Sequence, residues 1–529
     1  MKIYVKNDDI WLYPDEKTLG TAPYDGQPLQ LWAPKGGICG VQILADELTE
    51  PVTVSAEQSA VMLLREVTVQ YNTASDETTD FGDKPFVYIQ KQEVCPPHCT
   101  RIAPFQVYDA YLPYDGQPLQ GSRQAFFVQP DTSVAGSREL CVCIQSGEER
   151  VTVALSLRIY DAGLPEIPTL GLDHWFSLES MADRHGVARF SPEHYEKIAQ
   201  YAKIMASMRQ THFMLSPDIA LIDGKVDLSR LEQVADIFFE AGLQTLKIGP
   251  IGQRKRVYHE NLLALAKDGF PVDSAEGQAV LRSFFGAVSD LAEKKGWQDK
   301  IVFHLADEPD EPETAIPVRM KQYALLRNMV RDFLPQAKVC EAVKTAKFQE
   351  YIDILVPLSK TYEQDKASFD QALEQGSEVW LYTCCVPIGN YYQRFLDVPL
   401  HSCRQIFWGI ARNQITGYLH WGLNQLEPDQ HPFLQTNQSH SYGDGKILPA
   451  GDSHIMYPEK DKIYCSVRMN MYRKGCEDAE LLKLLHEKDL GLWQALTADY
   501  AQFHGSQDVQ SLRSLSLRLL EALEQSNIQ

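Results

Sequence analysis

Hydrophobic and polar residues alternate over short segments in the first 160 residues of the chain. The clearest are residues 52–56, 67–71 and 151–159, which are rich in valine, isoleucine and threonine and lie between glycine, proline and aspartate residues. Alternation with period two indicates half-buried strands, and the intervening residues favour turns. This region is therefore predicted to form a β-sandwich or a pair of small sheets.

The pattern changes after residues 161–168, a segment that contains glycine and proline. Short apolar runs then alternate with stretches of helical periodicity. The predicted strands are residues 169–173, 212–215, 246–249, 301–306, 338–343, 352–356, 379–383 and 417–421. The predicted helices between them include 193–208, 228–241, 276–295, 317–333 and 403–412.

Eight strands that alternate with helices over about 250 residues are typical of a TIM (β/α)8 barrel. The gap between the fifth and sixth strands is short for a full helix. A doubly wound parallel sheet is the alternative, but no glycine-rich phosphate loop follows any of the predicted strands. We therefore predict an α/β fold, with a barrel as the catalytic domain.

Regular periodicity ends after Leu426, and residues 427–458 are predicted to form a long polar loop. Apolar spacing returns from about Gly475, which predicts closing helices. The expected domains are an N-terminal β-rich domain over 1–162, the barrel over 163–475 and a C-terminal helical segment over 476–529 that packs on the barrel.

The net charge of −21 comes from acidic and basic residues that are interspersed, with no basic block. Nucleic acids and anionic membranes are therefore unsuitable partners, and a neutral substrate such as a sugar fits better. The first ten residues lack an apolar signal-peptide core, and no later run is long enough to span a bilayer. We expect a cytoplasmic protein.

Cysteine usage does not indicate a metal centre. The chain has 11 cysteines, an odd number that favours reduced thiols, and several lie in apolar runs. The motif Cys95-Pro-Pro-His-Cys99 has no second pair at zinc-like spacing. His304, Asp307 and Glu308 also lack a recognised ligand spacing. We expect neither a metal nor a cofactor.

Candidate chemistry is concentrated in residues 301–310, an apolar run that ends in Asp307 and Glu308 directly before Pro309. The proline disfavours helix at the residue before it and removes a backbone donor, so the strand should stop where the acids begin. Side chains at the carboxyl ends of barrel strands line the active site. Two acids there are costly to desolvate, which makes them functional candidates.

Paired carboxylates with aromatic residues at neighbouring strand ends indicate glycoside hydrolysis. Rings that could cover the apolar faces of a sugar are Trp175, Tyr382 and Trp421. Adjacent strand residues point to different sides, so Asp307 and Glu308 are poorly placed to flank a sugar as acid and opposing nucleophile. They could instead serve a substrate whose own 2-acetamido group is the nucleophile.

Several motifs resemble glycoside hydrolase family 123, whose known members are β-N-acetylgalactosaminidases. They are His304-Leu-Ala-Asp-Glu-Pro309, Trp380-Leu-Tyr-Thr383, Tyr418-Leu-His-Trp421, Gly443-Asp-Gly445 with Tyr457-Pro458, Ser466-Val-Arg468 and Arg473-Lys-Gly-Cys-Glu-Asp478. The resemblance covers most of the chain, and the Asp-Glu pair is its most specific part. Asn470 departs from the family pattern, because an acid is expected there.

The resemblance implies a role for each candidate. Asp307 would stabilise the acetamido group, Glu308 would be the acid/base, and Tyr382 would contact the acetamido group. Trp421 would be a platform for the sugar ring. The remaining implied contacts, to sugar hydroxyl groups, are His304, His420, Asn424 and Asp444. Trp175 stays a predicted substrate contact because it is an aromatic residue at a strand end.

Two other functions fit the same residues. An ordinary retaining β-glycosidase would use carboxylates from two strands, and Glu341 is the best partner for Glu308. A glycan-binding protein on an inactive barrel is the non-enzymatic alternative. The expected partner in every case is a small glycan or glycoconjugate, and the sequence does not predict an oligomeric state.

Overall fold

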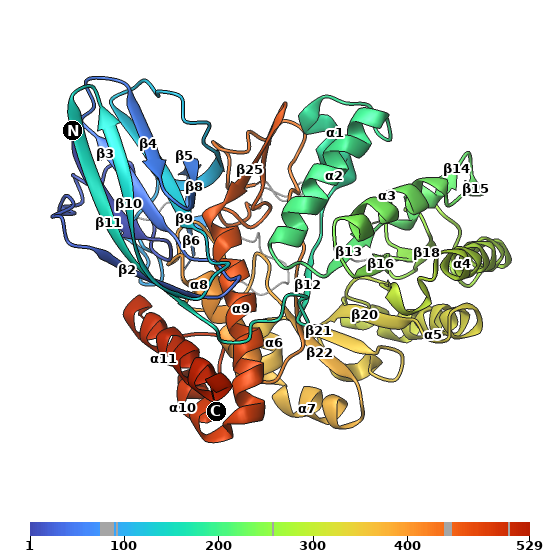
Figure 1. The fold of residues 1–529 in the computed structure, drawn as a ribbon. Coiled ribbons are helices and arrows are strands. Elements are labelled where there is room, and N and C mark those ends of the chain that lie inside the picture. Colours follow the sequence, from blue (N-terminus) through green and yellow to red (C-terminus); the bar gives the residue numbers. More distant parts are fainter. Residues whose placement is uncertain (75–88, 91–93, 256–258, 439–446, 506–507, 529) are drawn as a thin grey trace. The chain divides into compact units, whose positions relative to one another are not determined.

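The computed structural model describes residues 1–74, 89–90, 94–255, 259–438, 447–505 and 508–528 (Figure 1). The chain forms two compact units. The sandwich unit contains residues 1–169, 385–413 and 422–529, and the barrel unit contains residues 170–384 and 414–421. The predicted domain boundaries at residues 162 and 475 remain a prediction.

The sandwich unit contains two large sheets. The seven-stranded sheet has the order β1-β3-β9-β5-β8-β25-β24, and the four-stranded sheet has the order β2-β11-β10-β4. The strands of the first sheet are β1 (Lys2–Asn7), β3 (Val41–Asp46), β5 (Ser59–Val69), β8 (Phe105–Pro113), β9 (Arg123–Pro130), β24 (Tyr457–Glu459) and β25 (Lys462–Ser466). Those of the second are β2 (Leu29–Pro34), β4 (Val52–Ala56), β10 (Gly136–Ser146) and β11 (Glu149–Tyr160).

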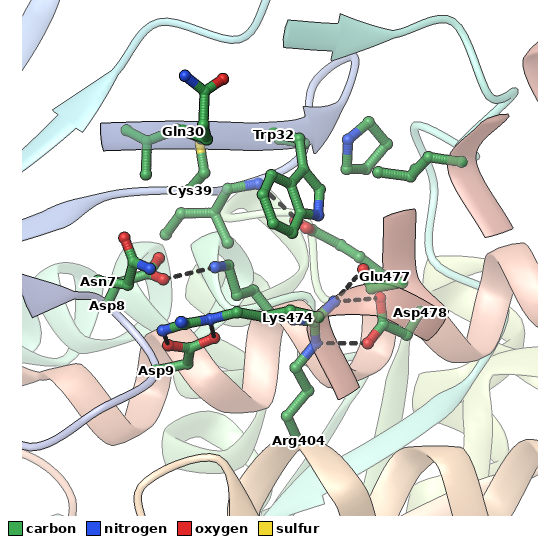
Figure 2. Close-up of a pocket in the computed structure, with 17 residues that line it drawn as sticks. Asn7, Asp8, Asp9, Gln30, Trp32, Cys39, Arg404, Lys474, Glu477 and Asp478 are labelled. Atoms are coloured by element: carbon green, nitrogen blue, oxygen red, sulfur yellow. Dashed lines mark hydrogen bonds and ion pairs between the residues drawn. The ribbon is translucent and has the colours of Figure 1, made fainter. Parts of the chain in front are cut away.

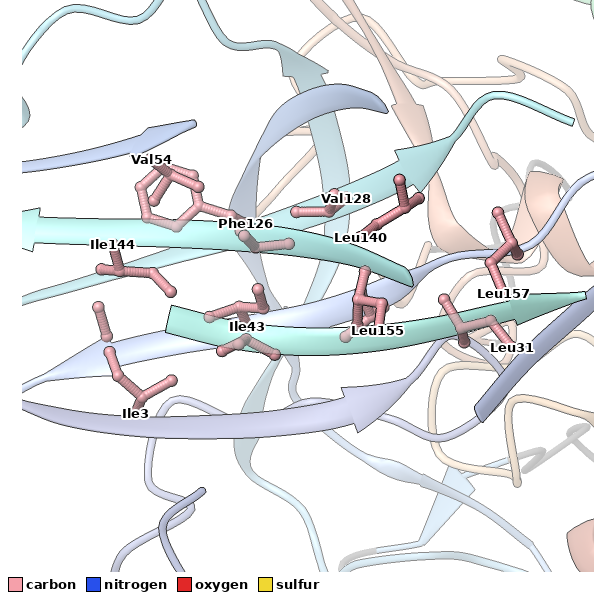
Figure 3. Close-up of a cluster of buried hydrophobic side chains, with 14 of the residues drawn as sticks. Ile3, Leu31, Ile43, Val54, Phe126, Val128, Leu140, Ile144, Leu155 and Leu157 are labelled. Carbon is pink, nitrogen blue, oxygen red and sulfur yellow. The ribbon is translucent and has the colours of Figure 1, made fainter. Parts of the chain in front are cut away.

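A single hydrophobic core joins the two sheets (Figure 3). On β11 every second residue from Val153 to Ile159 is buried, as the period-two pattern predicts. These side chains meet Ile43 of β3 and Phe126 of β9 in the same cluster. The predicted β-rich N-terminal region is therefore confirmed.

The helices of the sandwich unit are α8 (Ser402–Arg412), α9 (Val467–Lys488), α10 (Leu490–Thr497) and α11 (Val509–Ile528). The predicted C-terminal helices are confirmed, but the first of them begins before Gly475, because Ser466 caps α9 by accepting from Met469 N at 3.2 Å. Most of α9 from Val467 to Leu482 is buried on every side. It therefore lacks the amphipathic spacing from which a helix start is recognised.

Buried ion pairs tie the helices of this unit to the end of β1 (Figure 2). They involve acids at the end of β1 and on α9, and bases on α8, α9 and α11: Asp8–Lys474 at 2.7 Å, Asp9–Arg513 with Nε to Oδ2 at 2.8 Å, and Arg404–Asp478 with Nη2 to Oδ1 at 2.8 Å. Burial raises the pKa of Asp8 despite its lysine partner.

The barrel unit contains an eight-stranded parallel sheet with the order β12-β23-β22-β21-β20-β19-β16-β13. Thr211 N donates to Leu172 O at 3.2 Å and so bridges β12 and β13, the two ends of the sheet. The nearly closed barrel confirms the predicted fold class. Its strands are β12 (Gly171–His174), β13 (His212–Leu215), β16 (Thr245–Ile248), β19 (Ile301–Phe303), β20 (Lys338–Val343), β21 (Ile354–Pro357), β22 (Glu378–Tyr382) and β23 (Gly417–His420).

The helices of the barrel unit follow the strands in sequence, and several lie outside them in Figure 1. They are α1 (Leu178–His185), α2 (Pro192–Ser207), α3 (Ser229–Glu240), α4 (Ala275–Lys295), α5 (Ile316–Phe333), α6 (Ser359–Gln364) and α7 (Lys366–Glu374). The short gap between β20 and β21 holds only the 3-10 turn Ala346–Phe348. No described helix is both long and apolar enough to cross a membrane.

Trp380 of β22 fills the amino-terminal end of the barrel. A Cβ atom on Gly171 would lie 2.2 Å from this indole, and one on Gly417 would lie 2.3 Å from it. Two neighbouring strands therefore require glycine where they begin. The residues packed above, such as Ile354 and Leu419, form one cluster with Trp380 and Tyr382.

Candidate active site

Asp307 and Glu308 follow β19 at the carboxyl end of the barrel strands, as predicted. The strand ends at Phe303, three residues earlier than predicted, and His304, Leu305 and Ala306 remain buried. Glu308 has a φ of 43°, in the left-handed region that residues with a side chain rarely adopt. Such strain is found where the surrounding structure holds a functional residue in place.

Glu308 is in contact with Tyr382, the last residue of β22. The tyrosine hydroxyl donates to Glu308 Oε1 at 2.7 Å. Burial and the negative charge of Asp307 raise the pKa of Glu308, while Lys344, Tyr382 and Arg254 act in the opposite direction. The net effect raises its pKa, so Glu308 retains a proton to a higher pH than an ordinary glutamate and suits a general acid.

Asp307 has a more open and more cationic environment. Its side chain is 40% exposed, and Oδ2 lies 3.7 Å from Arg254 Nη2. The same guanidinium nitrogen donates to the main-chain oxygen of Asp307 at 2.6 Å, which fixes the turn. Oδ1 lies 3.8 Å from His304 Nε2. The two adjacent acids therefore lie in different environments.

Glu341 of β20 is fully buried beneath the acid pair. Oε1 accepts from Leu305 N, from Ala306 N at 3.1 Å and from the Tyr323 hydroxyl at 2.9 Å. Oε2 lies 2.6 Å from His304 Nδ1. A carboxylate so enclosed is held within the barrel wall, which argues against Glu341 as the nucleophile of an ordinary retaining glycosidase.

Trp175 follows β12 and is partly exposed. Its indole N–H donates to Asp173 Oδ2 at 3.1 Å, and the His304 ring lies 5.2 Å away between centroids. Lys247 Nζ lies 5.1 Å from the centre of the indole and pairs with Asp173 Oδ2 at 2.8 Å. The hydrogen bond to Asp173 and the ring contact with His304 hold Trp175 in place.

The other residues predicted to contact the substrate differ in burial and in the unit to which they belong. Trp421 follows β23 and its ring stacks near His420 at 6.5 Å, whereas His420 itself is fully buried. Asn424 belongs to the sandwich unit, where it is fully buried and bridges His454. Asp444 lies outside the described residues. The barrel unit thus brings together the acid pair, Tyr382, His304 and Trp175, and their predicted roles remain predictions.

Sequence reasoning missed the cations around the acid pair. Arg254 follows the two-residue strand β17 (Gly252–Gln253), and Lys344 follows β20 directly. Lys344 Nζ pairs with Glu311 at 2.9 Å, and its main-chain N–H donates to Asp310 Oδ2, also at 2.9 Å. A lysine directly after a predicted barrel strand was a usable signal for Lys344.

Arg319 of α5 also supports the loops next to the acid pair. It does not directly follow a predicted strand, so the sequence offers no reason to select it. It is fully buried and donates to His259 O at 2.7 Å and to Glu311 O. Burial lowers its pKa to about 10. Its partners are carbonyl oxygens on two loops, which a sequence pattern does not show.

Within the described residues, no group of three or more histidine, cysteine, aspartate or glutamate side chains is arranged to hold a metal ion. In the Cys95–Cys99 segment, Cys99 Sγ donates to Asp397 Oδ2 at 3.2 Å.

A barrel that presents paired carboxylates at its strand ends is compatible with a glycoside hydrolase, and a comparison with protein families points to the same class. Residues 246–485 match the family model described as "Glycoside hydrolase 123, catalytic domain". This segment is just under half of the chain and contains the acid pair. Residues 246–485 are therefore similar to the catalytic domain of glycoside hydrolase family 123.

A solved structure extends the likeness to almost the whole fold. A family 123 glycoside hydrolase from Clostridium perfringens, described for glycolipid glycan hydrolysis, is 12% identical with a TM-score of 0.70. The match covers 99% of this chain and 97% of that one. A β-galactosidase from Bacillus circulans sp. alkalophilus matches at 8% identity and a TM-score of 0.39, over 67% and 63% of the two chains. No curated protein matches the sequence.

Proposed function

We propose that the chain is a retaining hydrolase that removes β-linked N-acetylhexosamine, in particular N-acetylgalactosamine, by substrate-assisted catalysis. The observation that carries this proposal is the contrast between two adjacent acids. Burial raises the pKa of Glu308, whereas Asp307 is open to solvent and flanked by a guanidinium and an imidazole. Such a contrast in environment gives two neighbouring acids different roles, with Glu308 as the proton donor.

In the first step the acetamido oxygen of the substrate bonds to the anomeric carbon. The bond from that carbon to the leaving oxygen breaks, and Glu308 gives its proton to this oxygen. Asp307 accepts the acetamido N–H and stabilises the positive charge that develops on the group. In the second step Glu308 takes a proton from water as the water oxygen attacks the anomeric carbon. The bond from that carbon to the acetamido oxygen breaks, which restores the acetamido group, and configuration is retained.

The neighbouring residues support this division of roles. Tyr382 lies at hydrogen-bond distance from Glu308 and is fixed at the end of β22. It is therefore placed to shift its hydroxyl between the acid and an acetamido oxygen. The similar C. perfringens structure is described for glycolipid glycan hydrolysis, which supports a glycoconjugate as the substrate class.

Hydrolysis of matched aryl β-glycosides tests the proposal. The four substrates carry N-acetylgalactosamine, N-acetylglucosamine, galactose and glucose. We expect cleavage of the N-acetylgalactosaminide, its loss in Asp307→Asn and Glu308→Gln, and little cleavage of the two 2-hydroxy sugars. Product stereochemistry by proton NMR should show the β-anomer first.

Other outcomes would point elsewhere. Rapid cleavage of the plain galactoside would favour a carboxylate nucleophile and contradict acetamido participation. An unchanged turnover in Glu308→Gln would remove the acid/base assignment. Binding of the sugars without cleavage of any of them would favour the glycan-binding alternative.

A further inference from the structure

Glu341, His304 and Asp307 form a continuous array beneath and beside the acid pair. His304 is fully buried, with Nδ1 2.6 Å from Glu341 Oε2 and 3.2 Å from the main-chain oxygen of Cys340. Both neighbours of Nδ1 are acceptors, so Nδ1 carries a hydrogen in either charge state of the ring. Nε2 is therefore the atom that gains or loses a proton.

The other ring nitrogen of His304, Nε2, faces Asp307. The nitrogen is buried and makes no hydrogen bond within the described structure, and Asp307 Oδ1 is 3.8 Å away. A buried polar atom without a partner is costly, and catalytic hydrogen bonds often shorten only when substrate binds. The Asp307 side chain is 40% exposed and so has room to move toward the ring.

The charged groups that face the imidazole are acidic. Glu341 and Asp307 are acids on opposite sides of the ring. Trp175 packs against it without charge, and the nearby cation Lys247 is paired with Asp173. A carboxylate behind a histidine is a recurrent way to fix its tautomer and stabilise the imidazolium.

We propose that Glu341 and His304 are positioning residues that act through Asp307. Glu341 fixes the hydrogen on Nδ1, and the protonated ring donates from Nε2 to Asp307 Oδ1 in the substrate complex. This turns the Asp307 carboxyl group so that Oδ2 is left to accept the acetamido N–H. The inference rests on the proposed function, because it needs Asp307 to serve the acetamido group.

Glu341→Gln is the first test variant. The new amide oxygen can still accept from Leu305 N and Ala306 N, but the amide nitrogen opposes Nδ1–H of His304. We expect kcat on the aryl N-acetylgalactosaminide to fall about 10- to 100-fold with little change in KM, since an interaction used in the transition state is lost. Tyr323→Phe is the matched control, because it removes one donor from Glu341 and leaves the imidazole contact.

A double-mutant cycle separates positioning from simple structural support. If Glu341 acts through Asp307, adding Glu341→Gln to Asp307→Asn should lower kcat by less than about threefold, because coupled residues are not additive. Circular dichroism checks the fold, and His304→Gln gives a second cycle if Glu341→Gln does not fold. Additive losses, or wild-type kcat in Glu341→Gln, would overturn the inference. If the wild type does not cleave the aryl N-acetylgalactosaminide, that result would instead contradict the proposed function.

Discussion

The Tyr382 hydroxyl donates a hydrogen bond of 2.7 Å to Oε1 of Glu308 across the end of the barrel. Burial and the Glu308 charge hold the pKa of Tyr382 well above 10, so the tyrosine remains a donor throughout the range in which glycosidases work. The bond stabilises the ionised form of Glu308 and opposes the effect of burial. Tyr382 therefore tunes the acid/base as well as lining the site.

Replacing Tyr382 with phenylalanine tests this relationship. Loss of a donor to the carboxylate should raise the pKa of Glu308 further, so the basic limb of the kcat/KM profile should move to higher pH. We expect the maximum of kcat/KM to fall about 10- to 100-fold. Tyr351→Phe, a change on the same unit, is the control. An unshifted basic limb would contradict the assignment.

Two neighbours of Glu308 should shift the same limb in opposite directions. Asp307 raises the pKa of Glu308 and Lys344 lowers it. In Asp307→Asn, Glu308 should therefore lose its proton at a lower pH than in the wild type, so the residual activity should decline earlier. In Lys344→Met, Glu308 should keep its proton to a higher pH. Full pH profiles of kcat/KM for the three proteins measure both shifts. Equal shifts in one direction would show that another group controls the limb.

The glycines around Trp380 offer a test of the barrel. Gly417→Ala puts a methyl group 2.3 Å from the indole and should lower the free energy of unfolding by about 1–3 kcal/mol. Gly286 lies inside helix α4, where a Cβ atom would meet Phe333 at an ordinary 3.6 Å. Gly286→Ala should therefore stabilise by up to about 1 kcal/mol. Denaturant unfolding of both variants checks the opposite signs.

Breaking the buried pair Arg404–Asp478 should lower the free energy of unfolding more than breaking a surface pair. Arg404→Met leaves Asp478 buried with only the Trp408 indole as a remaining described donor at 2.7 Å. We expect a loss of about 3–5 kcal/mol, partly recovered in the double variant with Asp478→Asn. Lys366→Ala breaks an exposed pair with Asp370 and should cost less than about 1 kcal/mol. Chemical denaturation compares the three.

The fold was largely predictable because most elements carry local periodicity. The strand predicted at 338–343 is β20 to the residue, and all eight barrel strands lie within about three residues of their predicted ends. Elements buried on all sides were not predictable in this way. Helix α9 is buried on nearly every side over its first half, β24 begins at the end of the predicted loop, and no element was predicted at β25.

The site was predictable only where a motif joins strand and chemistry. Asp307, Glu308 and Tyr382 were found because acids and aromatics directly follow apolar runs. Arg254 was not predicted because the strand before it is only two residues long, and Glu341 was considered only as an alternative nucleophile. Its buried hydrogen bonds to Leu305 and Ala306 depend on which strands are neighbours, and that is a property of the closed barrel.

The same hydrogen bonds have a consequence for protein engineering. Beyond Phe303 the amides of Leu305 and Ala306 turn to a side chain of β20, so the two strands separate where the acids begin. The register of the Asp-Glu pair is therefore encoded on the adjacent strand. Suppose that residues 301–310 are grafted into another barrel that lacks a glutamate at the position of Glu341. The backbone before the acids would then lose its support, and Asp307 and Glu308 should not point into the site as they do here. The transferable part is a pair of strand ends, and the loop alone is insufficient.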